Sequence, residues 1–181
     1  MYRNKAIFIV FVVTGIVLNS CSIQGLTSGY KNLNNTQKAQ IQDAADFNLK
    51  QLQKGSYYDI SGSHLKYYAS QDTAAVVVIW TPHCTGKYCL SPNQIKKSLE
   101  GRGAVYVVAD AYEMEEIAKA PIDELPVFFI NARHYKSNLR LKYRVRFLQD
   151  LIGTSNWNDT MSYQSVFFFK NGQVAETRTH I

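Results

Sequence analysis

The sequence predicts an α/β fold built on a largely parallel sheet. Continuous apolar runs at 74–80, 104–110 and 126–131 have the length and the β-branched content of strands that are buried on both faces. Segments with helical character separate these runs, and parallel strands need such crossover connections. A later aromatic run ends in Asn171-Gly172, the residue pair typical of a tight β-hairpin. We therefore expect parallel strands followed by an antiparallel hairpin.

Capping residues predict where the helices begin. Ser91 is a suitable N-cap and Pro92 stands at the first helical position, so a helix should begin there. Earlier in the chain, a helix should begin at Asn35 or Thr36 and end at Gly55, because apolar residues between them form one broad side. A short helix is also expected over 113–119.

The segment 135–152 fits two patterns. Its apolar residues alternate as in a strand, but they also recur at helical spacing, and Gly153 is a good helix stop. We favour a helix, because the segment is long and joins two strands of the sheet. The same region is rich in Arg and Lys and has no acidic residue between 132 and 149. We expect a solvated helix face there, with a surface for anionic lipid headgroups or an acidic partner as the alternative.

Length and composition indicate one folded domain with accessory segments. The chain has 181 residues and is 46% hydrophobic, which argues against disorder. Its formal net charge is +6, and removing residues 1–21 would lower this charge by two. So weak a basic balance, without a nucleic-acid-binding motif, predicts no nucleic-acid partner.

The N-terminus resembles the signal peptide of a bacterial lipoprotein. A basic start precedes an apolar run at 6–18, which is too short to span a bilayer comfortably. Leu18, Ser20 and Cys21 then match the lipobox pattern, which implies lipidation of Cys21 and anchoring in the membrane. Ser22 instead of Asp after the cysteine resembles proteins sorted to the outer membrane. We expect a lipid-anchored protein of the bacterial cell envelope, facing the periplasm; a short membrane anchor or a buried helix is the alternative.

Two cysteines follow the first predicted strand, and their setting resembles a known family. The run Trp80-Thr81-Pro82-His83-Cys84 is similar to the strand-end Trp-x-x-x-Cys of thioredoxins, and Pro92 stands where thioredoxins kink the active-site helix. The run 165–172 resembles their final strand and hairpin. The resemblance covers roughly 70–178 and implies a thioredoxin-like three-layer α/β/α sandwich, with Cys84 as the attacking nucleophile.

The resemblance and the residues together suggest redox chemistry at this pair. Cys89 would resolve the mixed disulfide that Cys84 forms, while the nearby helix N-terminus and a protonated His83 would favour the thiolate. Thioredoxins separate their cysteines by two residues, whereas four separate Cys84 and Cys89. In a regular helix this spacing gives a rise of about 7.5 Å, beyond ordinary disulfide geometry. Pairing therefore predicts a loop over 84–90, with the helix beginning at Ser91.

The expected substrate groove contains residues from both walls. Its members are Trp80, Pro82, His83, Gln164 and Ser165. Thioredoxins place a cis-proline opposite the cysteines, and counting back from the hairpin puts Gln164 at that position. Pro126 is the rival; with it, 139–147 would become a hairpin strand.

These features divide the chain into four parts. Residues 1–21 are the signal peptide, 22–33 a polar tether, 34–69 an N-terminal helical extension, and 70–181 the thioredoxin-like domain.

Three functions remain open from the sequence. The favoured one is a thiol–disulfide oxidoreductase that acts on cysteines of other exported proteins without a cofactor. The alternative is a non-catalytic binding module in which Cys84 and Cys89 form a structural disulfide. A less favoured third is metal handling, in which the two thiolates with His83 would bind copper(I) or zinc. The resemblance to thioredoxin-like copper chaperones, which use a cysteine pair and a distant histidine, would instead assign His134 or His180 as the distant ligand.

Overall fold

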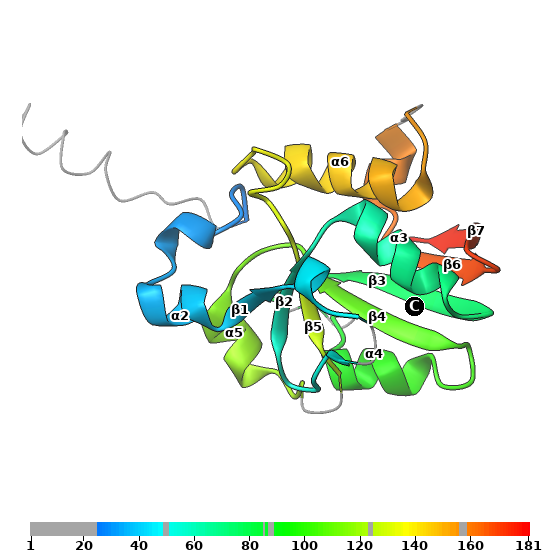
Figure 1. The fold of residues 1–181 in the computed structure, drawn as a ribbon, viewed down its shortest axis with the longest axis horizontal. Helices are drawn as coiled ribbons and strands as arrows, with labels where there is room; N and C mark the ends of the chain where they lie inside the picture. Colours follow the sequence, from blue (N-terminus) through cyan, green and yellow to red (C-terminus); the bar gives the residue numbers. More distant parts are fainter. Residues whose placement is uncertain (1–24, 49–50, 85, 87–88, 123–124, 156–158) are drawn as a thin grey trace, which may run out of the picture.

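A mixed sheet forms the centre of the computed structural model (Figure 1). The residues that the structure describes are 25–48, 51–84, 86, 89–122, 125–155 and 159–181. Within them the sheet has seven strands in the order β1-β2-β5-β4-β3-β6-β7. The strands are β1 (Ile41–Asp43), β2 (Tyr57–Ile60), β3 (Ala74–Trp80), β4 (Ala104–Ala109), β5 (Val127–Ile130), β6 (Val166–Lys170) and β7 (Gln173–Arg178).

The strand directions follow the predicted pattern. From β1 to β3 all neighbouring strands are parallel, while β6 is antiparallel to β3 and β7 antiparallel to β6. The hairpin between β6 and β7 turns at Asn171 and Gly172, both with positive φ. The predicted α/β class with a terminal hairpin is confirmed.

Helices cover both faces of the sheet. In Figure 1, α3 and α6 lie together on one side and α4 and α5 lie on the other. The helices are α2 (Asn35–Ala39), α3 (Gly62–Ser70), α4 (Pro92–Ser98), α5 (Met114–Lys119) and α6 (Arg140–Ile152). Short 3₁₀ turns occur at Tyr30–Asn32, Ala44–Asp46 and Asp159–Tyr163.

The core lies along the central strands because helices cover both of their faces. From Ala75 to Trp80 every residue of β3 is buried, and all of β5 is buried as well. Val77 lies opposite Tyr106 on one side and Phe167 on the other. These apolar runs place the end of β3, with Trp80, in the middle of the sheet.

The segment that fitted two patterns is a helix. Its apolar side chains Tyr143, Phe147, Leu148 and Leu151 are buried, and Gly153 ends it in the left-handed conformation with φ of 81°. At α4, Ser91 and Gln94 form a capping box and Pro92 is the first helical residue, as predicted.

The expected long helix beginning at residue 35 or 36 is wrong. Helix α2 ends at Ala39, and β1 and β2 then take the edge of the sheet. The apolar residues of this segment serve the sheet instead of a helix face. Tyr68, in α3, donates from its hydroxyl to the carbonyls of Ala44 and Phe47, both at 2.8 Å, and so holds the segment in a turn under α3. No helical extension stands apart from the sheet in the part described.

Residues 25–33, expected as part of a tether, lie against the folded domain. Thr27 pairs with Leu139, and Ser28 N donates to Asn138 O at 2.9 Å. The Ser28 carbonyl accepts from Tyr112 N at 2.7 Å, and Ser28 is 1% exposed. No helix in the described residues is long and apolar enough to cross a membrane.

Gly103→Ala tests the close approach between the turn before β4 and the start of β3. A Cβ at Gly103 would lie 2.2 Å from the Ala74 carbonyl oxygen, whereas a Cβ at Gly101 would meet nothing within 4 Å; both glycines have positive φ. We expect Gly101→Ala to cost about 1–2 kcal/mol of unfolding free energy from backbone strain. Gly103→Ala should cost a further ~1–3 kcal/mol, because the backbone must move. Urea unfolding measures both, and equal costs would contradict this packing.

Candidate functional site

The two cysteines form a disulfide just beyond the carboxyl end of β3. Their Cα atoms are 5.5 Å apart, within the usual range for a bridge. Cys84 N donates to Thr81 O at 3.2 Å, and Cys89 N donates to Gly86 O at 2.9 Å, so the chain turns twice. Helix α4 begins only at Pro92. The predicted pairing is confirmed, and the described residues within 84–90 lie in a loop, as predicted. The dipole of a helix acts mainly within the first turn of that helix, so α4 does not account for stabilisation of a thiolate at Cys84.

The two sulfur-bearing residues differ in exposure. Cys84 is exposed, while Cys89 is half-buried. The backbone N–H of Gly86 donates to Cys89 Sγ at 3.0 Å. An N–H directed at this sulfur stabilises negative charge on it. The bridge is therefore open to attack at Cys84, and Cys89 is the sulfur suited to leave as a thiolate.

The disulfide lies in the wall of a groove of about 420 Å³. Trp80 and Ser165, both expected there, line it together with the two cysteines. The remaining lining is mostly apolar and comes from three places: β3 and the start of β6, the region of α4, and the last three residues, 179–181. Tyr163, 73% exposed, also lines this groove. The sequence analysis missed Tyr163, Thr179 and Ile181 and named His180 only as a copper ligand; the β6–β7 hairpin brings 179–181 to the cysteines.

Three of the expected groove residues do not line it. Pro82 is buried. His83 Nδ1 lies 2.8 Å from Glu113 Oε2, so its ring is held toward the loop before α5. The side-chain oxygen of Gln164 is buried and, within the described chain, has no hydrogen-bond partner.

Pro126 lies away from the cysteines. It precedes β5, which β4 separates from β3. Residues 140–152 are helical, so the rival assignment that made 139–147 a hairpin strand is wrong. Every peptide bond among the described residues is trans. Ser165, just before β6, lines the groove next to the cysteine strand, whereas Gln164 precedes it without lining the groove.

The buried carboxylate of Asp110 connects the secondary-structure elements that form the site. The Asp110 side chain, just after β4, is 0% exposed. Its Oδ2 accepts from Thr81 Oγ1 at 3.0 Å, from Arg140 Nη2 at 2.7 Å and from Arg144 Nη1 at 3.2 Å. The Tyr143 hydroxyl donates to the Asp110 carbonyl. Since α6 supplies both arginines, this one carboxylate joins α6 to the carboxyl ends of β3 and β4.

The same cluster reaches the opposite wall of the groove. Arg144 Nη2 donates to Gln164 O at 3.1 Å, and Ser165 O accepts from Ile79 N at 2.7 Å. Burial lowers the pKa of Arg144, and the charge of Asp110 opposes this effect. Both walls are thus held to one charged centre, a feature that the sequence analysis did not predict.

The basic run around α6 is not a uniform solvated face. Arg140 and Arg144, one helical turn apart, point inward to Asp110, and Arg133 pairs with Asp59 at 2.8 Å. Lys136 and Lys142 are exposed. The spacing of four residues between Arg140 and Arg144 indicates that both lie on one face of the helix, but it does not identify their acidic partner.

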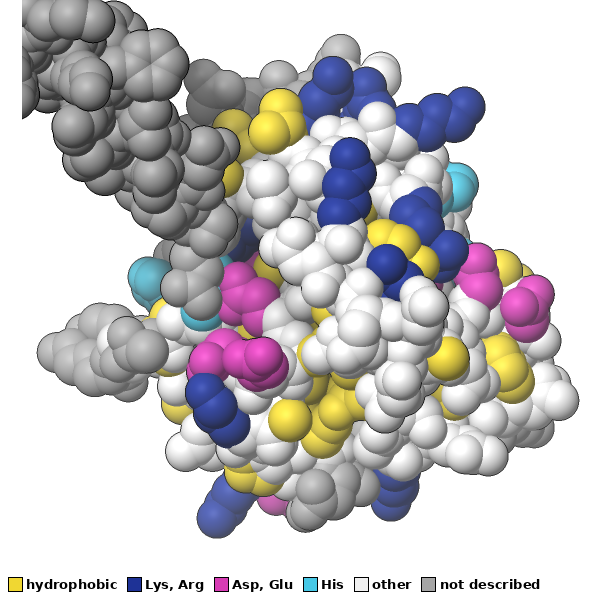
Figure 2. All heavy atoms as spheres, turned by 90° about the vertical axis from the view of Figure 1, so that its left-hand side faces the viewer, with side chains coloured by type: hydrophobic (Ala, Val, Ile, Leu, Met, Phe, Trp, Pro, Cys, Tyr) yellow, Lys and Arg dark blue, Asp and Glu magenta, His cyan; other side chains and the backbone are white. Residues whose placement is uncertain are grey.

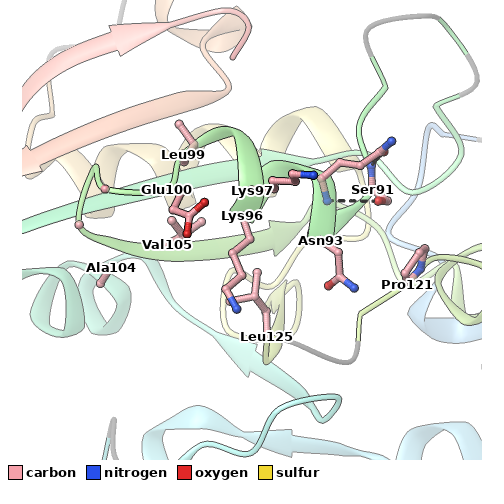
Figure 3. A pocket seen from close by; sticks show the side chains of 13 residues that line it. Ser91, Asn93, Lys96, Lys97, Leu99, Glu100, Ala104, Val105, Pro121 and Leu125 are labelled. Carbon is pink, nitrogen blue, oxygen red and sulfur yellow. Dashed lines mark hydrogen bonds between the residues drawn. The ribbon is translucent and has the colours of Figure 1, made fainter.

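A larger hollow lies along α4, the helix that also contributes Ile95 to the groove. It measures about 1060 Å³ and is lined by α4 and the segments before β4 and β5. Figure 3 shows Lys96 extending toward Leu125 across it. Neither cysteine lines it, and within the described ranges no three His, Cys, Asp or Glu side chains are grouped to hold a metal ion. The candidate site is therefore the smaller groove with the disulfide.

Comparisons with protein-family models, with curated proteins and with solved structures find no match for this chain. Any assignment of function consequently rests on the residues and their geometry.

Substitutions at the buried cluster should differ strongly in their effect. Asp110→Asn leaves two facing guanidinium groups without their carboxylate, and we expect a loss of about 3–5 kcal/mol. Arg144→Gln leaves a matched Arg140–Asp110 pair and should cost only about 1–3 kcal/mol. Lys142→Gln, on the exposed side of the same helix, is the control and should change stability by less than about 0.5 kcal/mol.

Urea unfolding with the disulfide intact measures these three variants. A smaller loss for Asp110→Asn than for Arg144→Gln would show that the carboxylate is not the centre of the cluster.

Proposed function

We propose that this protein is a lipid-anchored, thioredoxin-like thiol–disulfide oxidoreductase of the bacterial cell envelope that exchanges disulfides with exported proteins. The observation that carries the proposal is the exposed Cys84, bonded to Cys89 in the wall of a groove at the end of β3. Anchoring would follow from lipidation of Cys21, which lies outside the described residues.

The geometry supports one order of events at the pair. A thiolate of a reduced substrate attacks Cys84 Sγ, the Cys84–Cys89 bond breaks, and Cys89 leaves as a thiolate next to Gly86 N–H. A second substrate thiolate then attacks its own sulfur in the mixed disulfide and releases Cys84. Two electrons pass to the pair, the substrate gains a disulfide, and the reverse sequence reduces a substrate disulfide. The relative potentials of the pair and the substrate decide the direction.

Strand order supports the thioredoxin-like part of the proposal. The cysteine strand β3 lies between the parallel β4 and the antiparallel β6, with the β6–β7 hairpin at the sheet edge. Thioredoxins have the same neighbours around their cysteine strand. The chain departs from them in β5, which stands between β4 and β2, and in the four-residue gap between the cysteines.

Loop length disfavours a purely structural disulfide. In the chain-entropy model, a bridge between Cys84 and Cys89 closes so short a loop that it contributes only about 2 kcal/mol to stability. The bridge also joins no two elements of the fold, because both cysteines lie in one loop. A binding module held by this staple is the alternative.

Copper(I) handling is supported by a different observation. His180 lines the groove that also contains both cysteines, whereas His134 lies beyond β5, next to Tyr135. Two thiolates with one imidazole suit copper(I). This candidate requires the reduced pair.

A redox titration of the pair distinguishes the first two candidates. We expect a reduction potential above about −300 mV, within reach of cellular dithiols, because the bridge is exposed and closes a short loop. Mass spectrometry of alkylated protein after equilibration in dithiol buffers measures it, with and without added copper(I). A potential well below that value, without exchange activity, would leave the structural disulfide as the explanation. Binding of copper(I) by the reduced pair, lost in His180→Ala, would favour the third candidate.

The two single-cysteine variants should form mixed disulfides at different rates, because their remaining cysteines differ in exposure. Reduced Cys89→Ser keeps the exposed Cys84 and should trap a mixed disulfide with an oxidised model peptide that contains two cysteines. Cys84→Ser keeps only the half-buried Cys89 and should form the mixed disulfide more slowly. Non-reducing gel electrophoresis over time measures both rates. Equal rates would contradict the assignment of Cys84 as nucleophile.

A further inference from the structure

Three exposed leucines lie where the chain enters the folded domain. Leu26, Leu139 and Leu141 are 56%, 59% and 67% exposed. Arg140 N donates to Leu26 O at 2.9 Å, and Thr27 pairs with Leu139, so the entering chain and the start of α6 are held side by side. Leucines with more than half of their surface in water, gathered at one junction, indicate a surface that contacts an apolar medium.

Basic side chains belong to the two segments that meet at this junction, while Glu113, Glu115 and Glu116, from the start of α5, line a hollow together with Gly25 and Thr27. Lys136 and Lys142 are exposed and form no ion pair with any described residue. Neither 25–42 nor 131–149, the two segments that meet here, contains an acidic residue. In Figure 2, several basic side chains with hydrophobic ones beside them lie in the upper part of this face, and acidic side chains lie nearer its middle height. Basic groups next to exposed leucines match an anionic bilayer surface.

Chain length places this junction close to the proposed lipid anchor. Four residues separate Cys21 from Leu26, so the two are at most roughly 17 Å apart even when the chain is fully extended. From residue 26 onward the chain is fixed to the domain by the hydrogen bonds of Leu26 and Ser28. A bilayer that holds the acyl chains of Cys21 must therefore lie beside this side of the domain.

We propose that Leu26, Leu139, Leu141, Lys136 and Lys142 form a docking surface that lies in the headgroup region of an anionic bilayer. The inference rests on the lipid anchor of the proposed function and adds a fixed orientation to it. Such docking would also fix where the disulfide groove stands: the His83 ring, next to Cys84 in sequence, lies 3.4 Å from the position of a Cβ at Gly25. The cysteine loop is then adjacent to the membrane-facing side, and the accessible substrates are membrane-anchored or newly emerging proteins.

Site-directed spin labelling tests this orientation on the full, acylated chain with its disulfide intact. Leu141→Cys carries the label in vesicles of phosphatidylcholine and phosphatidylglycerol. Glu100→Cys is the control, because Glu100 is exposed in the turn after α4, on the other side of the sheet. We expect the label at 141 to lose most of its collisions with a water-soluble nickel chelate while it retains collisions with oxygen. The label at 100 should keep both.

A charge variant separates the lysines from the leucines. Lys136→Gln with Lys142→Gln should restore collisions with the nickel chelate at position 141, whereas the same charge change at the exposed Lys54 and Lys170 should not. No restoration would overturn the role of the two lysines.

The remaining outcomes are distinct. Intact-mass analysis first shows whether Cys21 is acylated. If it is, equal nickel collisions at 141 and 100 overturn the docking surface and leave the anchor standing. Spin–spin broadening at 141 would assign the surface to a second copy of the chain instead. An unacylated Cys21 overturns the anchor and the docking surface together, but leaves the thiol exchange at Cys84 unaffected.

Discussion

The Asp110 carboxylate is the interaction on which the rest of the structure depends. It is fully buried, and a buried charge is tolerated only when charged or polar partners surround it. Its partners come from the cysteine loop and from α6, and Arg144 extends the contact to the residues before β6. The groove exists because these elements are held at fixed distances. Without these contacts, the loop with the two cysteines would have no fixed surface opposite it.

The parts of this fold that were predictable are those that local pattern determines. The run at 74–80 is apolar throughout because both faces of β3 are covered. The Asn171-Gly172 pair indicates the turn between β6 and β7, because these residues adopt the positive φ that such a turn requires. Likewise, the spacing of Cys84 and Cys89 is incompatible with a paired regular helix, so the loop followed from geometry. Each of these conclusions needed only neighbouring residues.

Partners distant in sequence determine the remaining features. Strand β1 is three residues long, too short to show a period, and it is a strand only because β2 lies beside it. Arg140 and Arg144 look like members of a solvated basic face until Asp110, thirty or more positions earlier, is placed beneath them. The C-terminal residues join the groove for the same reason. Such pairings depend on the folded topology, which periodicity alone does not encode.

The pairing of residues 26–28 with 138–140 has a consequence for the order of folding. Ser28 and Asn138 are 110 positions apart and joined by a side-chain hydrogen bond of 2.6 Å. Contacts of such long sequence separation carry a large loop-closure cost and form late. If the chain crosses a membrane from its N-terminus, as the proposed function implies, residues 26–28 would have to wait for more than a hundred further residues to emerge. If the protein is exported as proposed, processing enzymes would act before this contact forms, and a late step of folding would close the domain onto the segment with which it begins.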